Sequence, residues 1–237
     1  GSGKTSTLYA SINHLNRPEL NIVTLEDPVE FKFDRINQSQ IEPSSGFDFS
    51  DGLRAVLRQD PDVILVGEVR DVETAEIAIR ASLTGHFVLT TIHTNDAPTA
   101  ITRLLDMGLE PFLIAASTSM IINQRLLRRM CPLCKKPIPT PNPLPEELEA
   151  IRNENIVLYK PEGCEACNYM GYKGRIPVFE FLKTTDDIKQ LILEKKSASE
   201  IRHYAISKGM KTLMQDALRL LKDEVTSYDE VLRIMTA

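Results

Sequence analysis

Short, strongly apolar runs alternate with helical patterns over the first 130 residues, and this alternation constrains the fold more than any other feature. Three runs are rich in β-branched residues and lie at 21–25, 62–66 and 86–92. Nearly continuous hydrophobicity of this kind is typical of parallel strands that are buried on both faces. The segments between them carry apolar residues at helical spacing. We therefore predict an α/β fold, in which helices cover a parallel sheet.

Candidate caps mark the helices of this region. Ser50 or Asp51 can cap the first helix, a second runs from about Glu73 to Gly85, and a third runs from an Asp96 cap to Gly108.

The composition changes after residue 130. Residues 137–145 have a proline at every second position, which excludes a helix or a central strand and predicts an extended connector. A strand over 176–182 leads into four predicted helices near 185–196, 199–208, 212–224 and 227–236. Their candidate caps are Asp186, Ser199 and Ser227.

Length and charge exclude some classes of protein. The chain has 237 residues, enough to bury a core, and its net charge of −5 is spread along the sequence. A nucleic-acid binder would concentrate Lys and Arg in a basic field, so we expect no nucleic-acid partner. The longest apolar stretch, 112–122, is too short to span a bilayer, and we expect a soluble chain.

The N-terminus matches part of a phosphate-binding motif. In the pattern G-x-x-x-x-G-K-[ST], backbone N–H groups surround the phosphates, the Lys contacts them and the hydroxyl binds Mg²⁺. Gly3, Lys4 and Thr5 fill the last three places, and the first glycine of the pattern would lie three residues before Gly1. We expect that the chain starts within this motif and that the preceding strand is missing. The alternative is a flexible, glycine-rich N-terminus.

Three predicted strands end in residues that suit nucleotide hydrolysis. This reaction needs a carboxylate at the carboxyl end of a strand near the phosphate loop. Glu68 follows the second run, and Glu26 and Asp27 follow the first. His93 follows the third, where an imidazole can contact a terminal phosphate. Polar residues are common at strand ends, and a backbone group can satisfy such a histidine, so each residue alone also has a structural interpretation.

The four cysteines form two pairs with metal-ligand spacing. Cys131 and Cys134 form one C-x-x-C pair, and Cys164 and Cys167 form the other. Two such turns can present four thiolates to one tetrahedral Zn²⁺, and four sulfur ligands predict a structural ion. Two disulfides, or a redox-active C-x-x-C pair, are the alternatives.

Taken together, these motifs resemble those of the secretion ATPase superfamily, specifically the type II secretion and type IV pilus assembly ATPases. Residues 1–9 resemble the end of the family's Walker A motif, 24–31 its Asp box, 57–71 its atypical Walker B motif and 84–96 its His box. The tetracysteine segment resembles the assembly and secretion branch, because the related retraction ATPases usually lack it.

The resemblance implies a RecA-like P-loop NTPase core, lacking its P-loop strand, over residues 1–130. A tetracysteine zinc-binding subdomain would follow over 131–175, and a small C-terminal helical subdomain over 176–237.

It also implies roles for individual residues. Gly1, Ser2, Gly3, Lys4 and Thr5 would bind the nucleotide, ATP, with Lys4 on its phosphates and Thr5 on Mg²⁺. Glu68 would be the principal catalytic acid, Glu26 would assist with Mg²⁺ or water, and His93 would respond to the γ-phosphate. Arginines from a preceding domain complete the nucleotide site in this family.

The expected function is an ATP-hydrolysing motor that powers pseudopilus or pilus assembly. The full-length protein would be a homo-hexamer in the cytoplasm, peripheral on the inner membrane through its partners. These partners would be the inner-membrane platform and cytoplasmic components of a secretion or pilus machine. An alternative is a catalytically incompetent, zinc-stabilised interaction module on that platform. The acidic balance disfavours a third possibility, a RecA-like nucleic-acid translocase.

Overall fold

The computed structural model describes residues 1–139, 148 and 156–235, and its contacts divide the chain into two compact units. The sheet unit comprises Lys4–Ile121 and Leu182–Gly209. The hairpin unit comprises Gly1–Gly3, Ile122–Phe181 and Met210–Ala237. Among the described residues, no helix has both the length and the apolar character needed to cross a bilayer.

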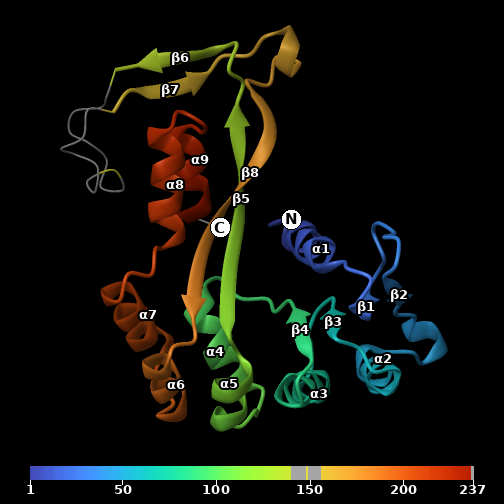
Figure 1. Cartoon of the computed structure of the whole chain (residues 1–237). Helices are drawn as coiled ribbons and strands as arrows, with labels where there is room; N and C mark the ends of the chain where they lie inside the picture. The colour runs from blue at the N-terminus through green and yellow to red at the C-terminus, as the bar shows by residue number, and fades with distance from the viewer. Residues whose placement is uncertain (140–147, 149–155, 236–237) are drawn as a thin grey trace. The chain divides into compact units, whose positions relative to one another are not determined.

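The sheet unit is built on four parallel strands in the order β2-β1-β3-β4 (Figure 1). Its strands are β1 (Ile22–Glu26), β2 (Asn37–Gln40), β3 (Val63–Val66) and β4 (Phe87–Thr90), and its helices are α1 (Lys4–Leu15), α2 (Phe49–Val56), α3 (Val72–Leu83), α4 (Ala97–Asp106), α5 (Pro111–Ser117), α6 (Asp186–Leu193) and α7 (Ala198–Ser207).

Helices cover both faces of this sheet. Ile12 of α1 packs on one face with Ile22, Val63 and Leu65. On the other face, α2 and α3 pack against β1 and β3, with a core of Val23, Leu25, Leu53, Val56, Ile64, Val66, Ala78 and Ala81. All residues of β1 and β3 are buried, as continuous apolar strands require. The predicted α/β fold with a parallel sheet is confirmed.

The start of α2 differs from the prediction. Asp48, not Ser50 or Asp51, is the N-cap, and its carboxylate accepts a hydrogen bond from the Asp51 N–H. Ser50 and Asp51 therefore lie inside the first turn. Asp96 caps α4 as predicted, by accepting from the Thr99 N–H at 2.7 Å.

The described part of the hairpin unit contains two pairs of strands and two helices. Strand β5 pairs with β8, and β6 pairs with β7 in antiparallel fashion (Figure 1). The bounds are β5 (Met120–Met130), β6 (Lys135–Ile138), β7 (Leu158–Pro161), β8 (Tyr172–Lys183), α8 (Leu213–Lys222) and α9 (Tyr228–Met235), and short 3-10 turns lie at Pro43–Ser45, Leu57–Gln59 and Glu165–Cys167.

After residue 110, the elements of the structure differ from the patterns in the sequence. The apolar stretch 112–122 contributes to both α5 and β5. β8 starts four residues before the predicted strand at 176. Pro137 lies in β6, which has a single neighbour and is therefore an edge strand, a position that tolerates proline. The rest of the predicted proline connector, from residue 140, lies outside the described residues.

Two of the predicted C-terminal caps are also wrong by one or two residues. Thr185, not Asp186, caps α6, and Ser197, not Ser199, caps α7. Ser197 forms a capping box with Glu200, a reciprocal pair that Ser199 cannot make from inside the helix. Ser227 precedes α9 as predicted, and its hydroxyl accepts from the Glu230 N–H at 3.4 Å.

Helices α8 and α9 share one core with the strands of the hairpin unit. This core contains Leu127, Leu148, Leu158, Val178, Ala217, Leu218, Leu220, Leu221 and Val231. The described part of this unit has two buried carboxyl groups, those of Glu180 and Glu230. Glu230 belongs to α9.

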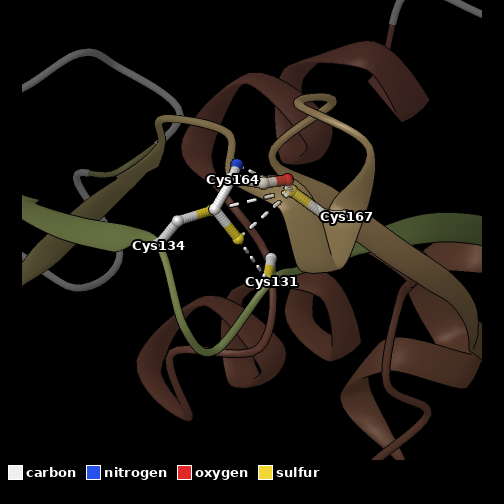
Figure 2. Close-up of side chains that lie close together, drawn as sticks. All are labelled: Cys131, Cys134, Cys164 and Cys167. Carbon is white, nitrogen blue, oxygen red and sulfur yellow. Dashed lines mark hydrogen bonds between the residues drawn. The ribbon is translucent and has the colours of Figure 1, made fainter.

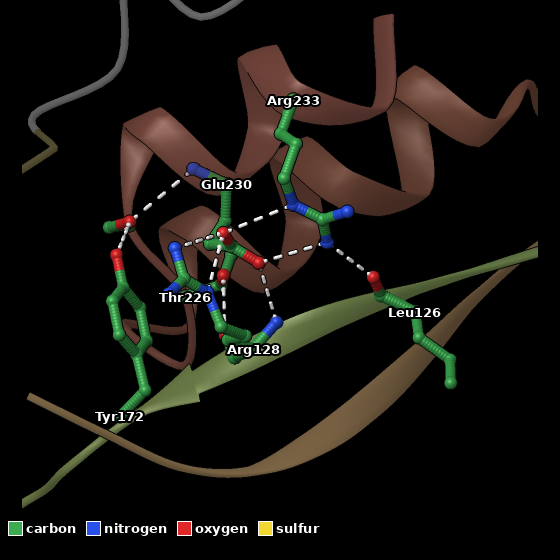
Figure 3. Close-up of polar contacts among 7 residues, drawn as sticks. Leu126, Arg128, Tyr172, Thr226, Glu230 and Arg233 are labelled. Carbon is green, nitrogen blue, oxygen red and sulfur yellow. Dashed lines mark hydrogen bonds and ion pairs between the residues drawn. The ribbon is translucent and has the colours of Figure 1, made fainter. Parts of the chain in front are cut away.

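Glu230 joins α9 to β5 through charged hydrogen bonds (Figure 3). Its side chain is 1% exposed and accepts from the Arg128 backbone N–H at 2.7 Å and from the Arg128 Nε at 2.9 Å. Arg233 Nη2 lies 3.0 Å from Glu230 Oε2, the oxygen that also accepts from the Arg128 N–H. Burial alone would raise the pKa of Glu230, but the hydrogen bonds from Arg233 and Arg128 lower it below its usual value.

Glu230→Gln is expected to lower the free energy of unfolding by about 2 kcal/mol, because charge-assisted hydrogen bonds to a buried group are lost. A depressed folded-state pKa stabilises the protein above the unfolded-state pKa, and this contribution is lost as the pH falls through the folded-state pKa. The difference between wild type and variant should therefore stay constant above about pH 5 and shrink as the pH falls below about 4. Urea unfolding at about pH 7 and about pH 3 measures it. Asp229→Asn, an exposed neighbour in the same helix, is the control. A difference that does not change with pH would contradict this account.

Candidate nucleotide site and cysteine cluster

Parallel pairing brings the ends of β1, β3 and β4 to one edge of the sheet. Leu25 is in register with Val66, and Val66 with Thr90. Beyond the strands, the Gly67 N–H donates to the Leu25 carbonyl at 2.8 Å, and the Val69 N–H donates to the Thr91 carbonyl at 2.9 Å. The residues that follow the three strands are therefore held beside one another.

A pocket of about 170 Å³ lies at this edge. Its lining includes all five residues of the sheet unit that the sequence singled out for the nucleotide site: Lys4, Thr5, Glu26, Glu68 and His93. Lys4 and Thr5 form the start of α1, where the helix presents N–H groups that favour anions.

A chain of polar contacts crosses the pocket. Lys4 Nζ lies 3.4 Å from His93 Nδ1, and His93 Nε2 lies 3.2 Å from Glu68 Oε2. Arg70 donates to the other oxygen of Glu68 and also lies 3.4 Å from Asp27. The imidazole of His93 thus bridges Lys4 and the strand-end acid Glu68.

Arg70 dominates the electrostatics of Glu68. The hydrogen bond from Arg70 holds the pKa of Glu68 below its usual value, and His93 adds to this effect, while partial burial opposes it. Glu68 is therefore a carboxylate at neutral pH and can accept a hydrogen bond from a water molecule.

Glu26 has a different environment, because it is buried and held by protein donors. Thr24 Oγ1 donates to Glu26 Oε1 at 2.5 Å, and Gln38 Nε2 donates to the same oxygen at 3.1 Å. Tyr9 donates to the other oxygen, and the Glu30 N–H in turn donates to the Tyr9 hydroxyl at 3.0 Å. Burial and the contact with Glu26 raise the pKa of Tyr9. Glu26 is a fixed hydrogen-bond acceptor in the wall of the pocket.

Sequence reasoning missed these supporting residues. Arg70 lies within the Walker B-like segment, but nothing in its local pattern showed that it would turn back onto Glu68. Tyr9 and Gln38 reach Glu26 from α1 and β2, so only the tertiary structure reveals their contacts.

The structure also gives a physical reason for Gly67, which lies in the segment that resembles an atypical Walker B motif. A Cβ atom at this position would lie 3.2 Å from the Leu25 carbonyl oxygen and 3.5 Å from the Glu26 Cα. Both are backbone atoms of the neighbouring strand, so a side chain would push β1 and β3 apart.

The remaining residues of the phosphate-binding motif belong to the hairpin unit. Gln124 Nε2 donates to the carbonyl of Ser2 at 3.0 Å and to that of Gly3 at 3.2 Å. Gly3 has a φ of +83°, a conformation that glycine adopts without strain. The role of Gly1, Ser2 and Gly3 in binding phosphates stays a prediction.

The four cysteines gather in one cluster of the hairpin unit (Figure 2). We call Cys131 and Cys134, between β5 and β6, the first cysteine pair, and Cys164 and Cys167, before β8, the second cysteine pair. All four sulfur atoms lie within 4.8 Å of one another. The separations Cys131–Cys164, Cys134–Cys167 and Cys164–Cys167 are each 3.8 Å.

These separations fit a tetrahedral metal site. Sulfur atoms about 2.3 Å from a Zn²⁺ ion lie about 3.8 Å from one another in a tetrahedron. A disulfide requires about 2.05 Å, so the predicted alternative of two disulfides does not describe this arrangement.

Backbone N–H groups donate to one sulfur atom of each cysteine pair. Gly163 N donates to Cys134 Sγ at 3.3 Å, and Gly171 N donates to Cys167 Sγ at 3.2 Å. Burial would raise the pKa of Cys167, but the N–H groups of Cys164 and Gly171 lower it to about 7. Burial raises the pKa of Cys134 to about 11.

Comparison with known families assigns the chain to one of them. Residues 1–233 match the model of the type II/IV secretion system protein family. The chain belongs to this family. Its curated relatives include the type IV pilus assembly ATPase PilB of Myxococcus xanthus, 47% identical over 98% of this chain and 41% of that protein. The type II secretion system ATPase E of Vibrio cholerae is 45% identical over 99% of this chain and 46% of that protein.

The fold of this family member also matches a solved motor protein. The crystal structure of the pilus retraction motor PilT with bound ADP has a TM-score of 0.70 and 29% identity, over 99% of this chain and 58% of that one. The predicted membership of the secretion ATPases is confirmed. The chain spans less than half the length of the two curated relatives named above.

Arg70→Ala is expected to raise the pKa of Glu68, because the largest interaction that favours the carboxylate is removed. NMR titration of the Glu68 carboxyl carbon in the labelled protein measures this shift. Arg80→Ala is the matched control, because it breaks an exposed Arg–Glu pair in α3. An unchanged Glu68 pKa in Arg70→Ala, or an equal shift in the control, would show that Arg70 does not set it.

Proposed function

We propose that this chain carries the ATP-hydrolysing region of a motor that powers pilus or pseudopilus assembly. The observation that carries the proposal is the pocket in which Lys4, at the start of α1, faces His93 and Glu68. A helix N-terminus with a lysine favours phosphate, and strand-end carboxylates suit the activation of water. Bound ADP in the related PilT structure supports a nucleotide as the ligand.

Binding would use the N-terminal residues. Lys4 would contact the terminal phosphates, and N–H groups of Gly1, Ser2 and Gly3 would surround them. The Thr5 hydroxyl would hold Mg²⁺, with the carboxyl group of Glu26 in the same pocket wall. Bound Mg²⁺ supplies positive charge that offsets the charge developing on the phosphate oxygens.

In hydrolysis, Glu68 would accept a hydrogen bond from the attacking water. The water oxygen forms a bond to the γ-phosphorus, the bond between that phosphorus and the β–γ bridging oxygen breaks, and ADP leaves with this oxygen. Glu68, which is ionised, accepts a hydrogen bond from the water and orients it; the water proton passes to the carboxylate or to phosphate.

His93 would connect phosphate binding to this acid. Its imidazole contacts both Lys4 and Glu68. A γ-phosphate beside Lys4 competes for the imidazole and frees Glu68 Oε2 for the water. His93 thereby responds to the terminal phosphate.

Zn²⁺ would be held by the two cysteine pairs. Four thiolates complete a tetrahedral shell and leave no position for substrate, so a bound zinc ion links the two pairs as a structural crosslink.

For the complete protein, we propose the organisation of its family. Residues 1–130 would form the RecA-like ATPase core, 131–175 the zinc subdomain and 176–237 the C-terminal helical subdomain. The protein would act as a cytoplasmic homo-hexamer, recruited to the inner membrane by the platform and cytoplasmic components of its machine. The named relatives include both pilus assembly and type II secretion ATPases, at nearly equal identity.

A second candidate function is that of an interaction module without turnover. Three large apolar side chains beside the cysteine cluster are exposed: Leu133 (76%), Tyr169 (71%) and Met170 (67%). Apolar groups around a rigid metal site suit docking to another protein.

Glu68→Gln in the complete protein is expected to lower ATP turnover by about a hundredfold or more, because the amide cannot accept the proton of the attacking water. Nucleotide affinity should be retained. Steady-state phosphate release and nucleotide titration measure the two quantities. Glu76→Gln, on the exposed side of α3, is the control and should turn over normally. Normal turnover in Glu68→Gln would refute the assignment of the acid.

The same assay separates the two candidate functions. We expect weak or no turnover from this chain by itself and recovery in a version extended by the upstream part of the phosphate-binding motif and the preceding domain. Absence of turnover in the extended protein would favour the interaction module.

One zinc ion per chain is expected from elemental analysis. Its removal by a chelator should increase hydrogen exchange within 131–175, because the two cysteine pairs are no longer linked. Exchange in α1–α3 of the sheet unit is the internal control. A chain without zinc and with its thiols oxidised to disulfides would refute the metal site.

A further inference from the structure

The turn between α8 and α9, residues 224–227, forms hydrogen bonds and an ion pair with the strands that flank the cysteine pairs. The Met130 N–H donates to the Val225 carbonyl at 2.8 Å, and Met130 directly precedes the first cysteine pair. Lys135 directly follows that pair, and its Nζ lies 2.7 Å from a carboxylate oxygen of Glu224. The turn thus holds both ends of the first cysteine pair.

The other half of the turn extends this contact to both long strands (Figure 3). Thr226 is fully buried, and its hydroxyl donates to the Arg128 carbonyl of β5 at 2.9 Å. The Ser227 hydroxyl lies 2.8 Å from the hydroxyl of Tyr172, the first residue of β8. Tyr172 follows the second cysteine pair, so the turn contacts the flanks of both pairs.

Helix α9, which follows this turn in the chain, also contacts the same stretch of β5. Arg233 Nη2 donates to the Leu126 carbonyl at 2.6 Å, and Glu230 accepts from the Arg128 backbone N–H. The backbone leading into the first cysteine pair therefore forms hydrogen bonds with the α8–α9 segment in addition to its pairing with β8.

The two cysteine pairs are also joined by backbone contacts. The Cys131 N–H donates to the Gly171 carbonyl at 2.9 Å, and the Gly171 N–H donates to Cys167 Sγ. A Cβ at Gly171, where φ is +75°, would lie 2.5 Å from the Pro161 side chain, so this approach is tight. A displacement of β5 would consequently move sulfur ligands on both sides of the cluster.

We propose that the α8–α9 turn is a positioning element of the cysteine cluster, so that metal binding and the packing of α8 and α9 stabilise each other. This inference rests on the proposed zinc site. Metal binding to a site that folding must assemble contributes its free energy to the folded state. The coupling between two such events is reciprocal. Zinc therefore holds the C-terminal helices in place, and the turn in return increases the affinity of the site for zinc.

The first arm of the test needs no variant. Hydrogen exchange is measured on this chain as purified with zinc and after chelation. We expect faster exchange in α8 and α9, although neither helix contains a metal ligand. Exchange in α4 and α5 of the sheet unit should stay unchanged.

The second arm measures the reciprocal effect. Thr226→Val keeps the size of the side chain but removes the donor to the Arg128 carbonyl, and should weaken zinc binding about tenfold in competition with a chromophoric chelator. Thr102→Val is the control, because it removes a similar hydroxyl contact within α4. Its zinc affinity should equal that of the wild type.

The possible outcomes distinguish a failure of the coupling from a failure of the zinc site. Normal zinc content with unchanged exchange in α8 and α9 after chelation would overturn the coupling and leave the zinc site intact. Wild-type zinc affinity in a folded Thr226→Val would do the same. A chain that binds no zinc would overturn the site and this inference together.

Discussion

The parallel pairing of β1, β3 and β4 is the constraint on which the candidate nucleotide site depends. Because parallel strands end at the same edge, residues up to 67 positions apart in the sequence, Glu26 to His93, line one pocket. The pairing continues past the strands through Gly67, whose missing side chain allows it to approach the Leu25 carbonyl. The start of α1 packs on the same sheet and brings Lys4 to this edge.

The two glutamates of the pocket differ through their surroundings, although both follow buried strands. Glu26 is closed in by Tyr9, Thr24 and Gln38, which fix both of its oxygens. Glu68 instead contacts the exposed side chains of Arg70 and His93 at the pocket surface. A carboxyl group held by buried donors, beside one with exposed partners, suits the proposed binding of a metal–nucleotide complex. In the hairpin unit, the cysteine cluster depends in the same way on contacts from a distant segment, the α8–α9 turn.

Much of the fold could be predicted because β-branched runs and helical periodicity are local signals. The strands at 22–26, 63–66 and 87–90 and the cap at Asp96 are such cases. The cap of α2 was misplaced because Asp48, Ser50 and Asp51 are all good caps, and only the backbone conformation distinguishes them. β5 is not evident from the sequence, because its Arg128 pairs with Glu230, 102 residues farther along the chain. The motif residues of the site could be named from the sequence, but their hydrogen-bond partners could not, because these partners come from other elements.

The structure of the complete protein with Mg²⁺ and a non-hydrolysable ATP analogue tests the central claim most directly. The account predicts that the terminal phosphate contacts Lys4 and His93, that Thr5 ligates Mg²⁺, and that Glu68 contacts a water in line with the γ-phosphorus. A nucleotide bound away from this edge of the sheet would contradict it. So would a bound γ-phosphate that leaves Lys4, His93 and Glu68 without contact to the nucleotide or its water.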